Sequence, residues 1–138
     1  MSLHRVDFGS LTRPSSPNTF LTAPNGLCQA AKVDQDPPVF AVSAAKLRQA
    51  FLSVVIAQPR VSHTLADEPE LYDDFVVRSA LFGFPDLVSV QFLPHGKGQS
   101  TLALYSRSVY GRSDLGVNRA RTLRWLKLVD AAVKPAPR

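Results

Sequence analysis

The spacing of apolar residues changes along the chain and predicts two helices on either side of a set of strands. From Ser43 to Val55, apolar residues recur every three or four positions, which is the period of a helix. Ser43 is a suitable N-cap, and Pro59 is expected to end the run. A second run with this period begins near Ser113 and ends before Pro135. Its expected buried stripe is Ala120, Leu123, Leu126, Val129 and Val133.

Between the two helices, apolar and polar residues alternate at every second position, which is the period of a strand. Turn residues divide this region into four expected strands, at residues 61–65, 71–80, 87–93 and 101–109. Short loops between consecutive strands favour antiparallel pairing. We therefore expect an α+β fold, in which a curved four-stranded antiparallel sheet has two helices packed against it.

Residues 1–40 show no clear period and contain five prolines. Each proline fixes φ and removes a backbone donor, so neither a regular helix nor a central strand is expected there. The segment also holds Phe8, Phe20 and Phe40, which a solvated linker would lack. We expect an extended arm that packs across the domain. The predicted order is arm-α-β-β-β-β-α, within a single domain that spans residues 1–138 and has its α+β core at 41–133.

The composition is that of a globular protein, with 45% hydrophobic and 20% charged residues. No apolar run reaches the ~18 residues that a membrane-spanning helix needs, and the start does not resemble a secretory signal. As the sequence stands, a cytoplasmic protein is expected. If Met1-Ser2-Leu3 comes from cloning, an upstream anchor would have been removed. In that case a membrane-anchored or periplasmic location and contact with a membrane stay open.

The net charge of +5 is unevenly distributed. Residues 1–96 contain seven Lys or Arg and nine Asp or Glu, which gives a net charge of −2. Residues 97–138 contain nine Lys or Arg and two Asp or Glu, which gives a net charge of +7. A basic end can bind nucleic acid or acidic lipid. Arg121 and Arg124 are expected to be exposed there. Aromatic residues interleave with the basic ones, as in proteins that bind single strands, but nucleic acid is disfavoured because no RNA- or DNA-binding signature is present.

A distinctive motif runs from Gly111 to Arg119, with the sequence Gly-Arg-Ser-Asp-Leu-Gly-Val-Asn-Arg. Together with Pro17-Asn18, Arg78-Ser79 and Phe84-Pro85-Asp86, it resembles the domain of unknown function 1499 family, over roughly residues 13–130. The resemblance implies bacterial and plastid relatives but supplies no activity. Many members carry cysteines flanking the early motif. This chain has Arg13 and Thr19 at those positions, so a disulfide or thiol role there is absent.

Few residues in the chain suit catalysis or metal binding. Cys28 is the only cysteine, and its expected role is that of a small packed apolar residue. The three histidines lack the spacing of a helical metal site, and no nucleophile elbow is present, so no metal and no cofactor are expected. Asp86 and Asp114 could divide acid and base roles. Ion pairs with nearby arginines are the commoner use of such carboxylates.

Two helices can cover one face of a four-stranded sheet, so the other face must meet the arm, a partner or a ligand. Its expected residues include Tyr72, Arg78, Tyr105 and Arg107, which suit an amphipathic anion. The leading hypothesis is a non-enzymatic binding module for a small or lipid-like ligand or a protein partner. An enzyme that uses Asp86 and Asp114, or a basic surface-interaction protein, stays open. The candidate site residues are Arg78, Asp86, Arg107, Arg112, Ser113, Asp114, Asn118 and Arg119.

Overall fold

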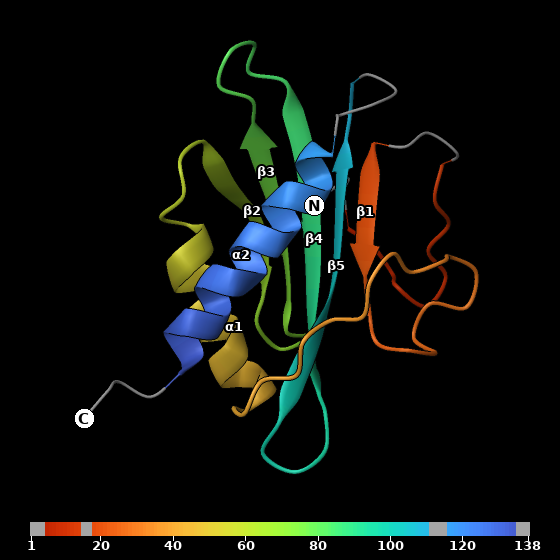
Figure 1. The fold of residues 1–138 in the computed structure, drawn as a ribbon, viewed down its shortest axis with the longest axis vertical. Helices are drawn as coiled ribbons and strands as arrows, with labels where there is room; N and C mark the ends of the chain where they lie inside the picture. The colour runs from red at the N-terminus through yellow and green to blue at the C-terminus, as the bar shows by residue number, and fades with distance from the viewer. Residues whose placement is uncertain (1–4, 15–17, 111–115, 135–138) are drawn as a thin grey trace.

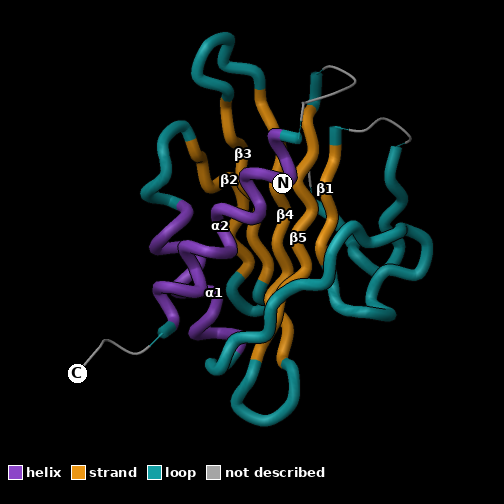
Figure 2. Tube along the Cα trace, in the orientation of Figure 1, coloured by secondary structure: helices purple, strands orange, loops and turns teal. Residues whose placement is uncertain are grey.

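The computed structural model describes residues 5–14, 18–110 and 116–134. Within them, the chain forms an α+β fold of two helices and one five-stranded sheet (Figure 1). Figure 2 shows the long loops that precede the first helix. The elements are β1 (Thr19–Thr22), α1 (Ala44–Val55), β2 (Val61–Asp67), β3 (Tyr72–Arg78), β4 (Pro85–Pro94), β5 (Ser100–Ser108) and α2 (Val117–Val133).

The sheet has the order β1-β5-β4-β3-β2, and every neighbouring pair is antiparallel. The prediction of four strands was wrong, because the arm contributes β1 as a fifth. Thr19 of β1 pairs with Arg107 of β5, and Thr22 pairs with Leu104. Prolines flank this short strand rather than interrupt it. It lies at the edge of the sheet, where nearby proline is tolerated, and on its outer side it makes only an isolated bridge, from Thr22 to Gln35.

The first helix follows its prediction closely. The hydroxyl of Ser43 accepts a hydrogen bond from the backbone N–H of Lys46, which confirms Ser43 as the N-cap. The helix buries Leu47, Phe51 and Val55 completely. It ends at Val55, four residues before the proline that was expected to stop it.

Both helices pack on one face of the sheet (Figure 1). Phe51 of α1 lies at the centre of this core and makes ring contacts with Phe75, Phe92 and Trp125, at centroid distances of 5.8, 5.3 and 6.0 Å. Edge-to-face packing of this kind adds to the hydrophobic stabilisation. The predicted inward face of β4, which includes Val88 and Phe92, belongs to the same core.

The other face of the sheet packs against residues that precede α1. Phe8 and Leu21 form a second core cluster with Tyr72, Ala103 and Tyr105. Because β5 is covered on both faces, it is buried along nearly its whole length.

The second helix confirms part of its predicted stripe, because Leu126 and Val129 are buried, but other predictions for it were wrong. Ala120 is exposed, whereas Arg121, which was expected to be exposed, is only 7% exposed. The inward residues are Asn118, Arg121, Thr122, Trp125, Leu126 and Val129. The polar residues among them face the sheet because Asp86 of β4 and Ser106 of β5 provide hydrogen-bond partners at that place. The described helix begins at Val117, with Gly116 as N-cap at a φ of 81°.

Gly116 adopts a left-handed backbone, which glycine tolerates without strain. Across the described residues, neither helix is long and apolar enough to cross a membrane.

Candidate functional site

A cavity of about 290 Å³ lies between the loop after α1, the ends of β3 and β4, and the N-terminal half of α2. We call it the arginine pocket. Its volume is near the lower end of the range for small-molecule sites. It is lined by Gln58, Pro59, Arg60, Val61, Val77, Arg78, Ser79, Ala80, Asp86, Val117, Arg121, Arg124 and Trp125.

The lining joins positive charge to an apolar wall. Four of the described lining residues are arginines, and Asp86 is their only carboxylate, which leaves a net charge of +3. Val61, Val77 and Trp125 form part of the apolar wall. A cavity with this lining suits a ligand that carries both an anionic group and an apolar group.

Two of the lining arginines, Arg60 and Arg78, are joined to each other by two hydrogen bonds. The backbone N–H of Arg78 donates to the carbonyl of Arg60 over 3.1 Å, and Nε of Arg60 donates to the carbonyl of Arg78, also over 3.1 Å. Arg60 adopts a φ of 60°, which is unfavourable for a residue other than glycine. Strained backbone of this kind tends to occur at functional sites. Both side chains remain exposed.

The floor of the pocket is an ion pair between α2 and β4. Nη2 of Arg121 lies 2.7 Å from Oδ2 of Asp86, and the two side chains are only 8% and 15% exposed. Nη1 of Arg121 also donates to the side-chain oxygens of Ser106 and Asn118, over 3.1 and 2.9 Å. With its donors engaged on two sides, Arg121 is fixed in place and neutralises Asp86.

Asn118 connects this floor to the N-terminal segment. Its Nδ2 donates to the backbone carbonyl of Asn18 over 2.9 Å and to Oγ of Ser108 over 2.9 Å. Its Oδ1 accepts from Oγ of Ser106 over 2.6 Å. Asn118 is 1% exposed, so the amide acts as a buried crosslink rather than as a ligand-facing group.

The structure disperses the other candidate site residues. Arg107 points to the face of the sheet opposite the helices, where Nη1 donates to Ser89 over 2.8 Å. Arg119 is exposed and lies over the ring of Phe20, 5.6 Å from its centroid. Arg112, Ser113 and Asp114 lie outside the described residues. Of the candidates that the structure describes, only Arg78 and Asp86 therefore line the arginine pocket.

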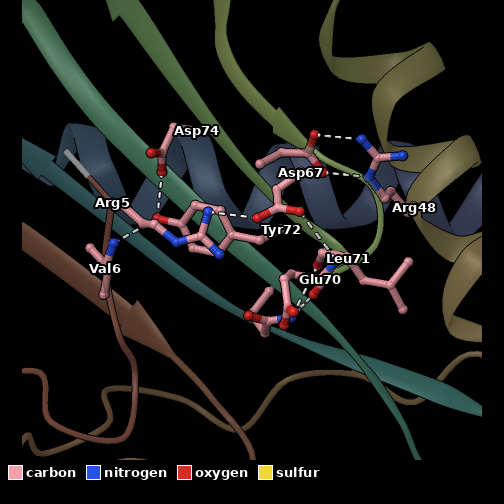
Figure 3. A network of polar contacts seen from close by, with 10 residues as sticks. Arg5, Val6, Arg48, Asp67, Glu70, Leu71, Tyr72 and Asp74 are labelled. Carbon is pink, nitrogen blue, oxygen red and sulfur yellow. Dashed lines mark hydrogen bonds and ion pairs between the residues drawn. The ribbon is translucent and has the colours of Figure 1, made fainter. Parts of the chain in front are cut away.

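A second polar network fastens the arm to the sheet. The hydroxyl of Tyr72 donates to Oδ1 of Asp74 over 2.6 Å and accepts from the backbone N–H of Val6 over 2.7 Å. Oγ of Ser89 donates to the same oxygen of Asp74. Figure 3 shows Arg5, Val6 and Asp74 gathered around Tyr72, and Arg5 lies 4.4 Å from the centre of its ring.

Burial governs the ionisation of this network. Burial, and then the hydrogen bond to Asp74, raise the pKa of Tyr72 to about 12. Burial lowers the pKa of the Arg107 guanidinium, although Tyr105 and Asp74 oppose the shift. Burial also raises the pKa of Tyr105. Neutral tyrosines at neutral pH suit a structural role at this contact.

A third buried group lies between α1 and the sheet. Arg48 makes a two-pronged contact with Asp73, with distances of 2.7 and 2.9 Å, and Nε2 of His63 lies 2.8 Å from the same carboxylate. Asp73 is completely buried, and His63 stacks on Phe75. This group ties the helix to the sheet. Among the described residues, no cluster of His, Cys, Asp and Glu could hold a metal ion.

A larger hollow of about 480 Å³ lies between the arm and β4, but its lining mixes charges of both signs. Arg5 faces it together with Asp7 and Glu70, so it carries no excess of positive charge for an anion. The arginine pocket is therefore the better candidate for a ligand.

The sequence also matches a family profile. The match covers residues 11–129 and is to the family described as "Protein of unknown function (DUF1499)". The chain belongs to this family. Arg13 and Thr19 stand where the resemblance implies cysteines in other members, and Nη2 of Arg13 donates to Oγ1 of Thr19 over 2.8 Å. A hydrogen bond therefore joins the two positions in this member.

The fold resembles that of a solved structure, "Crystal structure of Ara h 8.0201", with a TM-score of 0.50. The two chains are 10% identical, and the likeness covers 83% of this chain and 96% of the other. At this identity the likeness concerns the fold alone. A comparison with curated proteins found no match.

The sequence did not point to several residues of the pocket. Arg60 follows Pro59 in a loop and carries no motif, and Arg121 was interpreted as a surface residue. Trp125, one of the aromatic residues that interleave with the basic ones, is buried, with 1% exposed. The charge excess of the C-terminal part was the one signal that could have indicated Arg124.

Proposed function

We propose that this member of the DUF1499 family is a binding module whose arginine pocket takes a small amphipathic anion, with a phosphate or carboxylate head and an apolar body. The observation that supports this most is the lining of the pocket. Arg60, Arg78 and Arg124 are exposed, so their guanidinium groups can reach an anionic head. Arginine forks match phosphate and carboxylate oxygens in pairs.

The floor of the pocket supports binding rather than catalysis. Arg121 already neutralises Asp86, so a bound anion is not repelled by a bare carboxylate. Asp86 is also the only carboxylate among the described lining residues. An enzyme that divides acid and base roles would need a second such group.

The proposal is tested with octyl phosphate, by calorimetric titration at low ionic strength. The emission of Trp125 gives a second readout, because it is the only tryptophan in the chain and lines the pocket. Wild type is expected to bind octyl phosphate, with weaker binding of inorganic phosphate and of octanol. Each of these two probes lacks one half of the ligand.

Arg124→Gln removes one exposed charge from the pocket and is expected to weaken octyl phosphate binding about tenfold or more. Lys127→Gln is the matched control, because it removes an exposed charge from the same helix outside the pocket. If wild type does not bind octyl phosphate, or if both variants bind it equally well, the proposal is wrong.

A further inference from the structure

Among the described residues, five large apolar side chains are exposed at the end of the sheet beside the arginine pocket. They lie in the loop between β3 and β4 and just after β5, and we call them the apolar tip: Leu81, Phe82, Phe84, Val109 and Tyr110. Leu81 is 80% and Phe82 68% exposed. The three aromatic rings of the tip form a chain of contacts, with centroid distances of 5.4 Å for Phe82–Phe84 and 5.5 Å for Phe84–Tyr110. Contiguous exposed apolar groups mark interaction sites.

The tip is built onto the pocket. Nη1 of Arg78, which lines the pocket, donates to the carbonyl of Gly83 at the turn of the tip over 2.9 Å. Ser79 closes the same loop, because its hydroxyl accepts from the N–H of Phe84 and its carbonyl accepts from the N–H of Gly83. A surface that receives the tip is therefore brought against the mouth of the pocket.

Positive and negative side chains gather at opposite ends of β3. Arg60, Arg78 and Arg124 lie at the end of the sheet that carries the tip. The last residue of β2 and the turn after it carry Asp67, Glu68 and Glu70, of which Asp67 pairs with Arg5. The seven residues of β3 separate these two ends by about 20 Å. Figure 1 shows the β3–β4 loop projecting at the top of the sheet. An anionic surface attracts the arginines beside the tip and repels the acidic turn, so this separation of charge orients the tip toward such a surface.

We infer that the apolar tip docks into an anionic lipid bilayer, so that the arginine pocket takes the phosphate head of a membrane lipid. The inference rests on the proposed function and names the source of the ligand. Aromatic and aliphatic side chains flanked by arginines are the composition of interfacial membrane contacts. The five side chains on these two segments offer on the order of 500 Å², less than the ~800 Å² that each partner buries in a standard protein interface.

The test compares binding to phosphatidylglycerol–phosphatidylcholine vesicles with binding to octyl phosphate in solution. Wild type is expected to co-sediment with the mixed vesicles but not with vesicles of pure phosphatidylcholine. Added salt is expected to release it from the mixed vesicles. The double variant Phe82→Ser, Phe84→Ser is expected to bind the vesicles at least ~10-fold more weakly and to bind octyl phosphate as wild type does. Because both side chains are exposed, its melting temperature should be unchanged.

Val39→Ser is the matched control, since Val39 is exposed beside the opposite end of β5. It is expected to leave vesicle binding unchanged. If the double variant binds vesicles as tightly as wild type, the docking inference is wrong while the pocket stands. If wild type binds octyl phosphate but not vesicles, the ligand is soluble and the inference falls. A dimer that the double variant abolishes would assign the tip to a protein contact instead. Failure of octyl phosphate to bind wild type overturns the proposed function itself.

Discussion

Nη2 of Arg121 on α2 lies 2.7 Å from Oδ2 of Asp86 on β4, and both side chains are largely buried. The pair fastens the N-terminal half of α2 to the sheet and forms the floor of the arginine pocket. Arg121 was expected to lie on the surface, so the pair explains why the helix turns this arginine inward. It also holds two residues of the pocket lining in place.

Asp86→Asn is expected to destabilise the protein by about 3 kcal/mol, because it leaves the buried guanidinium of Arg121 without its anion. Asp130→Asn is the control, because Asp130 pairs with Lys134 on an exposed part of the same helix, where a salt bridge contributes little. Urea denaturation measures both. An Asp86→Asn variant as stable as wild type would show that the pair does not hold the helix.

Ionisation of Tyr72 is expected to lower the free energy of unfolding at alkaline pH. Its pKa is about 12 in the folded protein and about 10 when unfolded, so the folded state holds the proton more tightly. This contribution is fully present below about pH 10 and is lost as the pH rises toward 12.

Tyr72→Phe removes that titrating group along with its hydrogen bonds to Asp74 and Val6. The variant is expected to be about 1–3 kcal/mol less stable than wild type at neutral pH. The difference should shrink as the pH rises above 10, in denaturation curves recorded from pH 8 to 11. A difference that stays constant over this range would count against the raised pKa.

The sequence predicted the elements with a regular period and a clear boundary. Ser43 capped α1 as expected, and the alternation over residues 87–93 predicted a strand that the structure has as β4, because burial of one face imposes a two-residue period. The strand at Thr19–Thr22 was missed since it is four residues long and its flanking prolines resemble those of a loop.

The pocket was harder to predict because its residues come from segments that are far apart along the chain. Arg60 and Arg78 face each other only through the antiparallel pairing of β2 and β3. Arg121 is buried by its partners Asp86 and Asn118, and a charged residue in an amphipathic helix gives no sign of such partners. The sheet register and the packing of α2 on the sheet bring these groups together.

The account depends on where an amphipathic anion binds, and a crystal structure of the protein with octyl phosphate tests this most directly. The phosphate is expected within hydrogen-bonding distance, ~3 Å, of at least two guanidinium groups among Arg60, Arg78 and Arg124, with the octyl chain against Trp125. A phosphate bound instead at the hollow beside Arg5, or anywhere outside the arginine pocket, would contradict the account.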